Sequence, residues 1–126
     1  MITFRYLTEF EPPAPFVSVT VGHPAAERAT NLIPARVDSA ADRTVIPLSV
    51  AEGLQLEPVD ERQFEGVGGH VEPMPIYLVS MTIRGFGPHP LAVAAHRAEP
   101  VILLGRDVLN HYRIVLDGPN QTLEIG

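Results

Sequence analysis

The sequence predicts a single all-β domain, built as a small closed β-barrel with one or two short helices. Its 126 residues are enough for about one domain with a hydrophobic core of its own. Thirteen prolines and ten glycines interrupt the chain every few residues, which leaves room for many short strands and almost no long helix. Residues 16–21 alternate strictly between apolar and polar side chains, as a half-buried strand does.

The first half of the chain continues this pattern. Residues 31–37 form the next predicted strand, and residues 44–46 resume extended structure after a loop. Residues 47–52 favour one or two helical turns, because Pro47 stands near their start and Gly53 just past their end.

A β-hairpin dominates the middle of the chain. Gly68 and Gly69 form a two-residue turn signal between the extended segments 64–67 and 70–72, so a protruding hairpin is expected there. The remaining elements are predicted as strands at 76–83, 91–95 and 101–104, a short helix at 106–111, and a final hairpin at 113–125. The number of predicted strands is typical of a closed β-barrel.

Composition removes several classes of function. The chain has no cysteine, so disulfides, thiolate metal sites and a cysteine nucleophile are excluded. Its net charge is −6 without a basic block, so no nucleic-acid partner is expected. No apolar run approaches the length of a membrane span and the N-terminus does not resemble a signal peptide, so we expect a soluble cytoplasmic protein with no membrane contact. The five histidines have no metal-ligand spacing, and neither a metal nor a cofactor is expected; they are His23, His70, His89, His96 and His111.

Two motifs carry the chemistry. The run Asp38-Ser39-Ala40-Ala41 follows an apolar strand, so a carboxylate is presented by a tight loop of small residues. Downstream, the apolar residues 101–104 end abruptly at Gly105-Arg106-Asp107. Taken alone, Asp38 and Ser39 fit a simple turn or cap equally well.

Together the two motifs resemble the paired signature of retroviral-type (retropepsin-like) aspartic proteases, over roughly residues 16–125. Ala40 stands where glycine is commoner in that family. Two carboxyl groups about 3 Å apart share one proton, so one can deprotonate a water while the other hydrogen-bonds the scissile carbonyl. This chain has one such aspartate, so the resemblance implies an aspartic endopeptidase that acts as a homodimer on peptide or protein substrates.

The resemblance also assigns roles to individual residues. Asp38 is the expected catalytic acid, Ser39 is expected to hydrogen-bond across the dimer axis, and Asp42 is expected to pair with Arg106. Support of the acid loop is assigned to Ser39, Ala40, Ala41, Asp42, Thr44 and Arg106. The flap that covers a peptide is assigned to Gly66, Val67, Gly68, Gly69 and His70, and packing behind the loop to Leu104 and Gly105.

The chain ends allow two interpretations. Residues 2–6 and 123–125 alternate like strands, and they either build an intersubunit sheet, as in retroviral-type proteases, or add to their own barrel. Residues 9–15, rich in proline, are expected to be a stiff, extended connection within an N-terminal arm that spans residues 1–15.

Two other functions remain open from the sequence. One is a catalytically silent domain of the same fold that binds peptides or dimerises. The other is an unrelated small barrel that binds a small ligand, for which the sequence offers no converging polar cluster.

Overall fold

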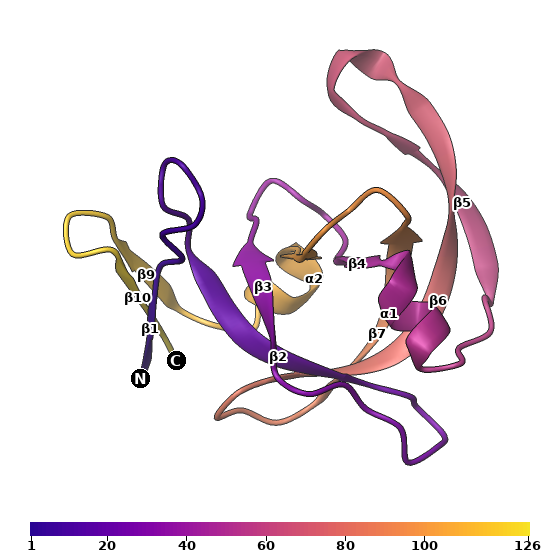
Figure 1. Ribbon diagram of the computed structural model, residues 1–126, viewed down its shortest axis with the longest axis horizontal. Coiled ribbons are helices and arrows are strands. Elements are labelled where there is room, and N and C mark those ends of the chain that lie inside the picture. The colour runs from indigo at the N-terminus through magenta and orange to yellow at the C-terminus, as the bar shows by residue number, and fades with distance from the viewer.

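The computed structural model describes all 126 residues and is built almost entirely of strands (Figure 1). The strands are β1 (Ile2–Arg5), β2 (Phe16–Gly22), β3 (Ile33–Val37), β4 (Val45–Pro47), β5 (Asp60–Glu65), β6 (Val71–Ile83), β7 (His89–His96), β8 (Ile102–Leu104), β9 (Ile114–Asp117) and β10 (Thr122–Ile125). The helices are α1 (Leu48–Gly53) and α2 (Arg106–Leu109), with a single 3-10 turn, η1 (Val67–Gly69). The predicted all-β class is confirmed.

One seven-stranded sheet forms the barrel. Its strand order is β2-β3-β8-β4-β7-β6-β5, and β2 also pairs with β6, which brings the sheet back on itself. Most neighbours are antiparallel, but β3 runs parallel to β8 and β4 parallel to β7. The core inside is aliphatic, with Val19, Ile46, Met81 and Leu104 fully buried. The parallel pairing of β3 with β8 matters for function, because it brings the predicted acid loop beside the second motif.

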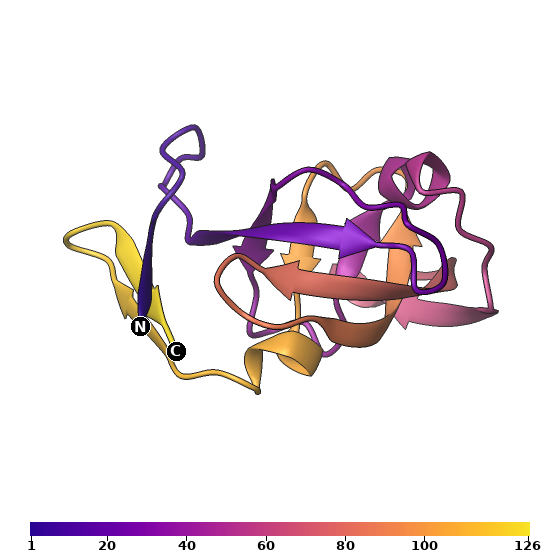
Figure 2. The same ribbon diagram turned by 90° about the horizontal axis from the view of Figure 1, so that it is seen from below.

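The chain ends form a small sheet of their own, in the order β1-β10-β9. Figure 2 shows this sheet at one end of the molecule, joined to the barrel by two chain segments. Phe4 pairs with Leu123, and both are buried together with Ile125. Of the two interpretations of the termini, the structure therefore shows pairing within one chain, in a sheet beside the barrel.

The prediction of an extended connection at residues 9–15 is wrong. Leu7 and Ala14 form an isolated bridge, in which the Leu7 N–H donates to the Ala14 carbonyl at 2.9 Å, so the segment between them is a closed loop. Inside the loop, the ring of Phe10 stacks on Phe16 with centroids 5.0 Å apart. Proline stiffens a chain locally, but the path of this segment is determined by the aromatic contact and the bridge.

The helices lie where they were expected but end differently. Helix α1 includes Gly53 rather than stopping before it, and the residue with positive φ after the helix is Gln55 (φ 56°). Helix α2 has four residues and ends at Leu109, short of the predicted residue 111. Neither helix has the length that a membrane crossing requires.

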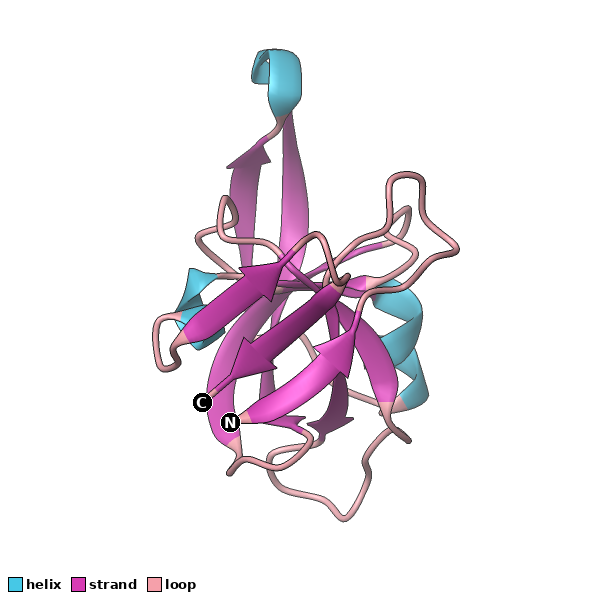
Figure 3. Cartoon of the chain, turned by 90° about the vertical axis from the view of Figure 1, so that its left-hand side faces the viewer, coloured by secondary structure: helices cyan, strands magenta, loops and turns pink.

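The predicted central hairpin is present and rises well clear of the barrel (Figure 3). Strand β5 pairs with β6 from Asp60–Ile76 up to Glu65–Val71, and η1 forms the tip. Gly68 and Gly69 have φ of 84° and 77°, a backbone region that favours glycine, which is why this turn needs them.

Candidate active site

The acid loop begins where β3 leaves the barrel. The N–H of Asp38 donates to the Leu104 carbonyl at 3.1 Å, so the parallel pairing of β3 and β8 extends to the first residue of the loop. The Val37 N–H donates to the Pro15 carbonyl on the other side at 3.0 Å. Backbone bonds of Val37 and Asp38 thus hold the start of the loop from both sides, and the Asp38 side chain is partly exposed at the end of β3.

The Asp38 carboxylate also shapes the loop. Its Oδ1 accepts the Ala40 N–H at 3.1 Å, and the Asp38 carbonyl accepts the Ala41 N–H at 3.2 Å. These two bonds form the tight turn that the sequence predicts at residues 38–41. Oδ2 accepts no hydrogen bond within the chain. Neither alanine has positive φ, so Ala40 occupies its place without strain.

A buried hydroxyl locks the far end of the loop. Thr44, which is 0% exposed, donates from Oγ1 to Asp107 Oδ1 at 2.6 Å and from its backbone N–H to Asp107 Oδ2 at 3.0 Å. The same Oγ1 accepts the Gly105 N–H at 3.1 Å. Thr44 and Gly105 were expected to support the loop, whereas Asp107 was part of the second motif but had no expected role. An acid at the start of a helix was visible, but its partner lies 63 residues away in the chain.

Gly105 lies tightly behind the acid loop. A Cβ atom at this position would be 2.7 Å from the Arg43 carbonyl carbon and 3.0 Å from the Ala41 carbonyl oxygen. Both contacts are with backbone atoms, which cannot relieve the clash by a change of side-chain rotamer. The Arg106 N–H next to it donates to the same Ala41 carbonyl at 2.9 Å. The second motif therefore holds the acid loop mainly through backbone contacts.

The expected ion pair between Asp42 and Arg106 is absent. The Arg106 guanidinium instead donates from Nη1 to the Ser39 carbonyl at 2.8 Å. Both Asp42 and Arg106 are exposed, so water solvates the two charges and an ion pair would add little. Arg106 still ties helix α2 to the acid loop, but through the loop backbone.

The flap residues stand apart from the acid loop in a single chain (Figure 1). All five, Gly66 to His70, are exposed, and the side chain of Val67 is completely so. Lower down, an open pocket of about 370 Å3 separates Asp42 and Arg43 from residues 62–65 of strand β5. The space between the acid loop and the flap is therefore open along its base.

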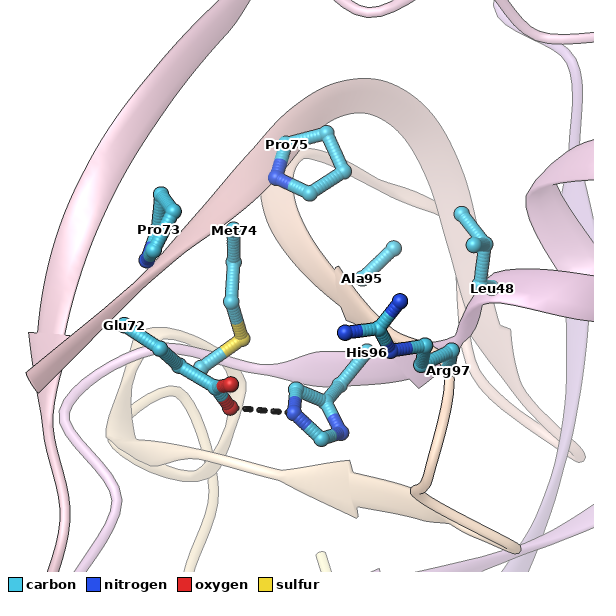
Figure 4. Close-up of a pocket in the computed structure, with 8 residues that line it drawn as sticks. All are labelled: Leu48, Glu72, Pro73, Met74, Pro75, Ala95, His96 and Arg97. Carbon is cyan, nitrogen blue, oxygen red and sulfur yellow. Dashed lines mark hydrogen bonds and ion pairs between the residues drawn. The ribbon is translucent and has the colours of Figure 1, made fainter. Parts of the chain in front are cut away.

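Another pocket of about 200 Å3 lies at the base of the flap, between β6, the end of β7 and the start of α1 (Figure 4). His96 Nε2 and a Glu72 carboxylate oxygen are hydrogen-bonded across it. Met74, Pro75 and Leu48 supply apolar walls. No residue of the acid loop lines this pocket.

The histidine with a shifted pKa lies outside the acid loop. Burial, and then the nearby His111, lower the pKa of His89 from its ordinary value of 6.5. The two rings stack with centroids 4.7 Å apart, and His89 Nε2 is hydrogen-bonded to the Tyr112 hydroxyl at 2.5 Å. Burial also raises the pKa of Tyr112. No group of three or more metal-ligating side chains gathers anywhere in the chain.

The barrel, the aspartate loop braced by a Gly-Arg-Asp segment, and the glycine-tipped hairpin define a retropepsin-like domain. Residues 28–108 match the sequence model of the family described as "Aspartyl protease". The chain belongs to this aspartyl protease family. No curated protein matches it.

Solved structures show the same fold. A retropepsin-like aspartic protease from Rickettsia conorii superposes with a TM-score of 0.63 at 11% identity, covering 99% of this chain and 91% of that one. The retroviral protease-like domain of Ddi1 from Leishmania major gives 0.55 at 20% identity, covering 89% and 87%. EIAV protease, bound to an inhibitor, gives 0.52 at 22% identity, covering 78% and 86%. The chain spans only 16% of a foamy viral protease-reverse transcriptase that also matches.

Proposed function

We propose that this chain is an aspartic endopeptidase that works as a homodimer. The observation that carries the proposal is the state of Asp38 in one chain. The residue is held at the strand end by backbone bonds, one carboxylate oxygen accepts the Ala40 N–H, and the other has no partner. A single carboxylate cannot act as both acid and base, so a second copy must supply the other.

In the proposed dimer the two Asp38 carboxyl groups lie around one water. They share a proton, because two like charges so close cannot both form without a large electrostatic cost. The ionised carboxylate takes a proton from the water as it attacks the peptide carbonyl. The protonated carboxyl donates a hydrogen bond to that carbonyl oxygen, where negative charge develops.

The flap supports a peptide as substrate. Its strand β5 is an edge strand of the sheet, and the open pocket beside Asp42 and Arg43 lies at its base. An extended peptide can pair with such backbone, which gives affinity for the main chain of many sequences. We propose that the exposed Val67 at the tip packs on the bound peptide or on the partner's flap.

Cleavage of an unfolded protein across about pH 3–7, a window around carboxylate pKa values, tests the proposal. Wild type should cleave, Asp38→Asn should not, and Asp117→Asn should match wild type because Asp117 lies in the terminal hairpin. Solution mass should show a dimer under the same conditions. Wild-type protein that is dimeric but cleaves nothing would instead favour the catalytically silent peptide-binding domain.

A further inference from the structure

Arg36 is an unusual residue for its position. It lies on β3 two residues before Asp38, and its Nε is the one buried side-chain polar atom of the chain that has no hydrogen-bond partner. The rest of its guanidinium donates no hydrogen bond within the chain either. A buried donor without an acceptor destabilises the fold, so an unpaired Arg36 Nε calls for an explanation.

Two aromatic rings hold the guanidinium in place. The Arg36 Cζ lies 4.8 Å from the ring centroid of Phe10 and 5.4 Å from that of Phe16. Contact with aromatic faces orients a guanidinium without using its N–H groups, which point outward from its edge. The loop closed by Leu7 and Ala14, which departs from the predicted extended arm, is what brings Phe10 to this position.

The geometry of β3 places this cation beside the acid. Side chains two residues apart on extended backbone point to the same side, about 7 Å apart. The backbone bonds of Val37 and Asp38 to the neighbouring chain segments extend the strand to Asp38, and Ala35 lies on the opposite, fully buried face. Arg36 and Asp38 therefore face the same side of the sheet, next to Leu103 on β8.

The other arginines near the loop are already engaged. The Arg106 guanidinium donates to the Ser39 carbonyl, Arg43 Nη1 donates to the Ala92 carbonyl, and Arg62 pairs with Asp60. Arg36 alone among these four has no polar partner in its own chain. A carboxylate from a bound molecule would satisfy it, and a guanidinium can bind both oxygens at once.

We propose that Arg36 is a specificity-determining residue that selects peptides with a glutamate or aspartate side chain next to the bond held at Asp38. This inference rests on the proposed function, because it takes the peptide to lie across Asp38. The net charge of −6 repels an acidic peptide at long range, so a preference for one must come from a local cation.

The test uses two pools of unstructured peptides that are identical except for Glu or Gln at the central positions. Wild type should cleave the Glu pool about 10- to 100-fold more efficiently, the range expected for one hydrogen bond to a charged group. Arg36→Met keeps an apolar side chain against the stacked rings of Phe10 and Phe16 and should abolish the ratio. Arg84→Met is the matched control, since Arg84 lies over Phe4 at 4.9 Å on an exposed turn, and it should keep the ratio.

Binding of the same pools to Asp38→Asn protein, with and without Arg36→Met, separates this inference from the proposed function. A Glu preference in binding that Arg36→Met removes supports the inference even where wild type cleaves nothing. Equal binding and cleavage of the two pools overturns it, as does a preference that survives in Arg36→Met. Loss of the dimer in Arg36→Met, with no Glu preference in wild type, also overturns it and assigns Arg36 to the interface between copies.

Discussion

The buried hydroxyl of Thr44 allows the sharpest test of how the acid loop is held. Thr44→Val keeps the shape of the side chain and removes its hydroxyl. The Gly105 N–H then loses its acceptor, and Asp107 Oδ1 loses a donor at 2.6 Å, while the backbone N–H of Thr44 still reaches Asp107 Oδ2. An unpaired buried donor costs about 1–3 kcal/mol, and a hydrogen bond to a charged group contributes about 1.5–3 kcal/mol.

We therefore expect Thr44→Val to lower the free energy of unfolding by about 3 kcal/mol. Thr44→Ser keeps the hydroxyl and loses one methyl group, so it should cost about 1 kcal/mol, in line with the transfer of a small apolar group. Thr82→Val is the control, because Thr82 on β6 makes no side-chain hydrogen bond.

Urea unfolding followed by circular dichroism measures all three variants, with the protein concentration held constant because any self-association would add to apparent stability. A loss below about 1 kcal/mol in Thr44→Val, or a larger loss in Thr44→Ser, would refute the argument that this hydroxyl locks the loop. Proteolytic activity should fall with Thr44→Val more than with a control variant of equal stability, since the loop it braces presents Asp38.

Three further predictions follow from the same structure. Gly105→Ala should destabilise the fold by about 1–3 kcal/mol or more, because its Cβ would meet Arg43 backbone at 2.7 Å; unchanged urea unfolding would contradict this. The pKa of His89 is lowered on folding, so the folded state binds fewer protons and stability should fall as pH drops below about 6.5. His89→Asn should make the midpoint of thermal unfolding depend less on pH in this range. A midpoint that depends on pH as steeply as in wild type would contradict the role of His89. Gly68→Ala should strain the flap tip by about 1 kcal/mol, because Gly68 has φ of 84°, although an added Cβ would meet nothing within 4 Å. The midpoint of thermal unfolding should therefore fall by a few degrees and cleavage should decrease, and an unchanged midpoint would contradict the strain.

The two motifs were visible in the sequence because each depends on local chemistry. A carboxylate followed by small residues and an apolar run cut by glycine are patterns within a few residues, and the structure brings these two segments together at β3 and β8. The signal for the flap hairpin was equally local, since the two adjacent residues Gly68 and Gly69 provide the positive φ of the turn whatever lies around them. Most strands were placed correctly for the same reason, because alternation is a property of neighbours, but the first arm of the hairpin is Asp60–Glu65 rather than the predicted residues 64–67.

Contacts between distant residues escaped sequence reasoning. Asp42 and Arg106 are opposite charges whose pairing looked reasonable, yet the guanidinium donates to the Ser39 carbonyl instead. Asp107 was seen as part of the second motif but was given no role, although both its oxygens accept hydrogen bonds from Thr44. A sequence shows which groups are charged, but not which backbone carbonyl lies closer than a partner side chain.

The sequence by itself determined the all-β class, the acid loop, the glycine-tipped hairpin and the absence of cysteine chemistry, because these follow from residue type and short-range alternation. Only the tertiary structure decided that β1 pairs with β10 in its own chain and that the segment after it closes into a loop. It also placed Phe10 over Arg36, beside the strand that carries Asp38. The reason is that edge pairing and aromatic stacking depend on which surfaces meet once the barrel has formed, and no pattern along the chain records that.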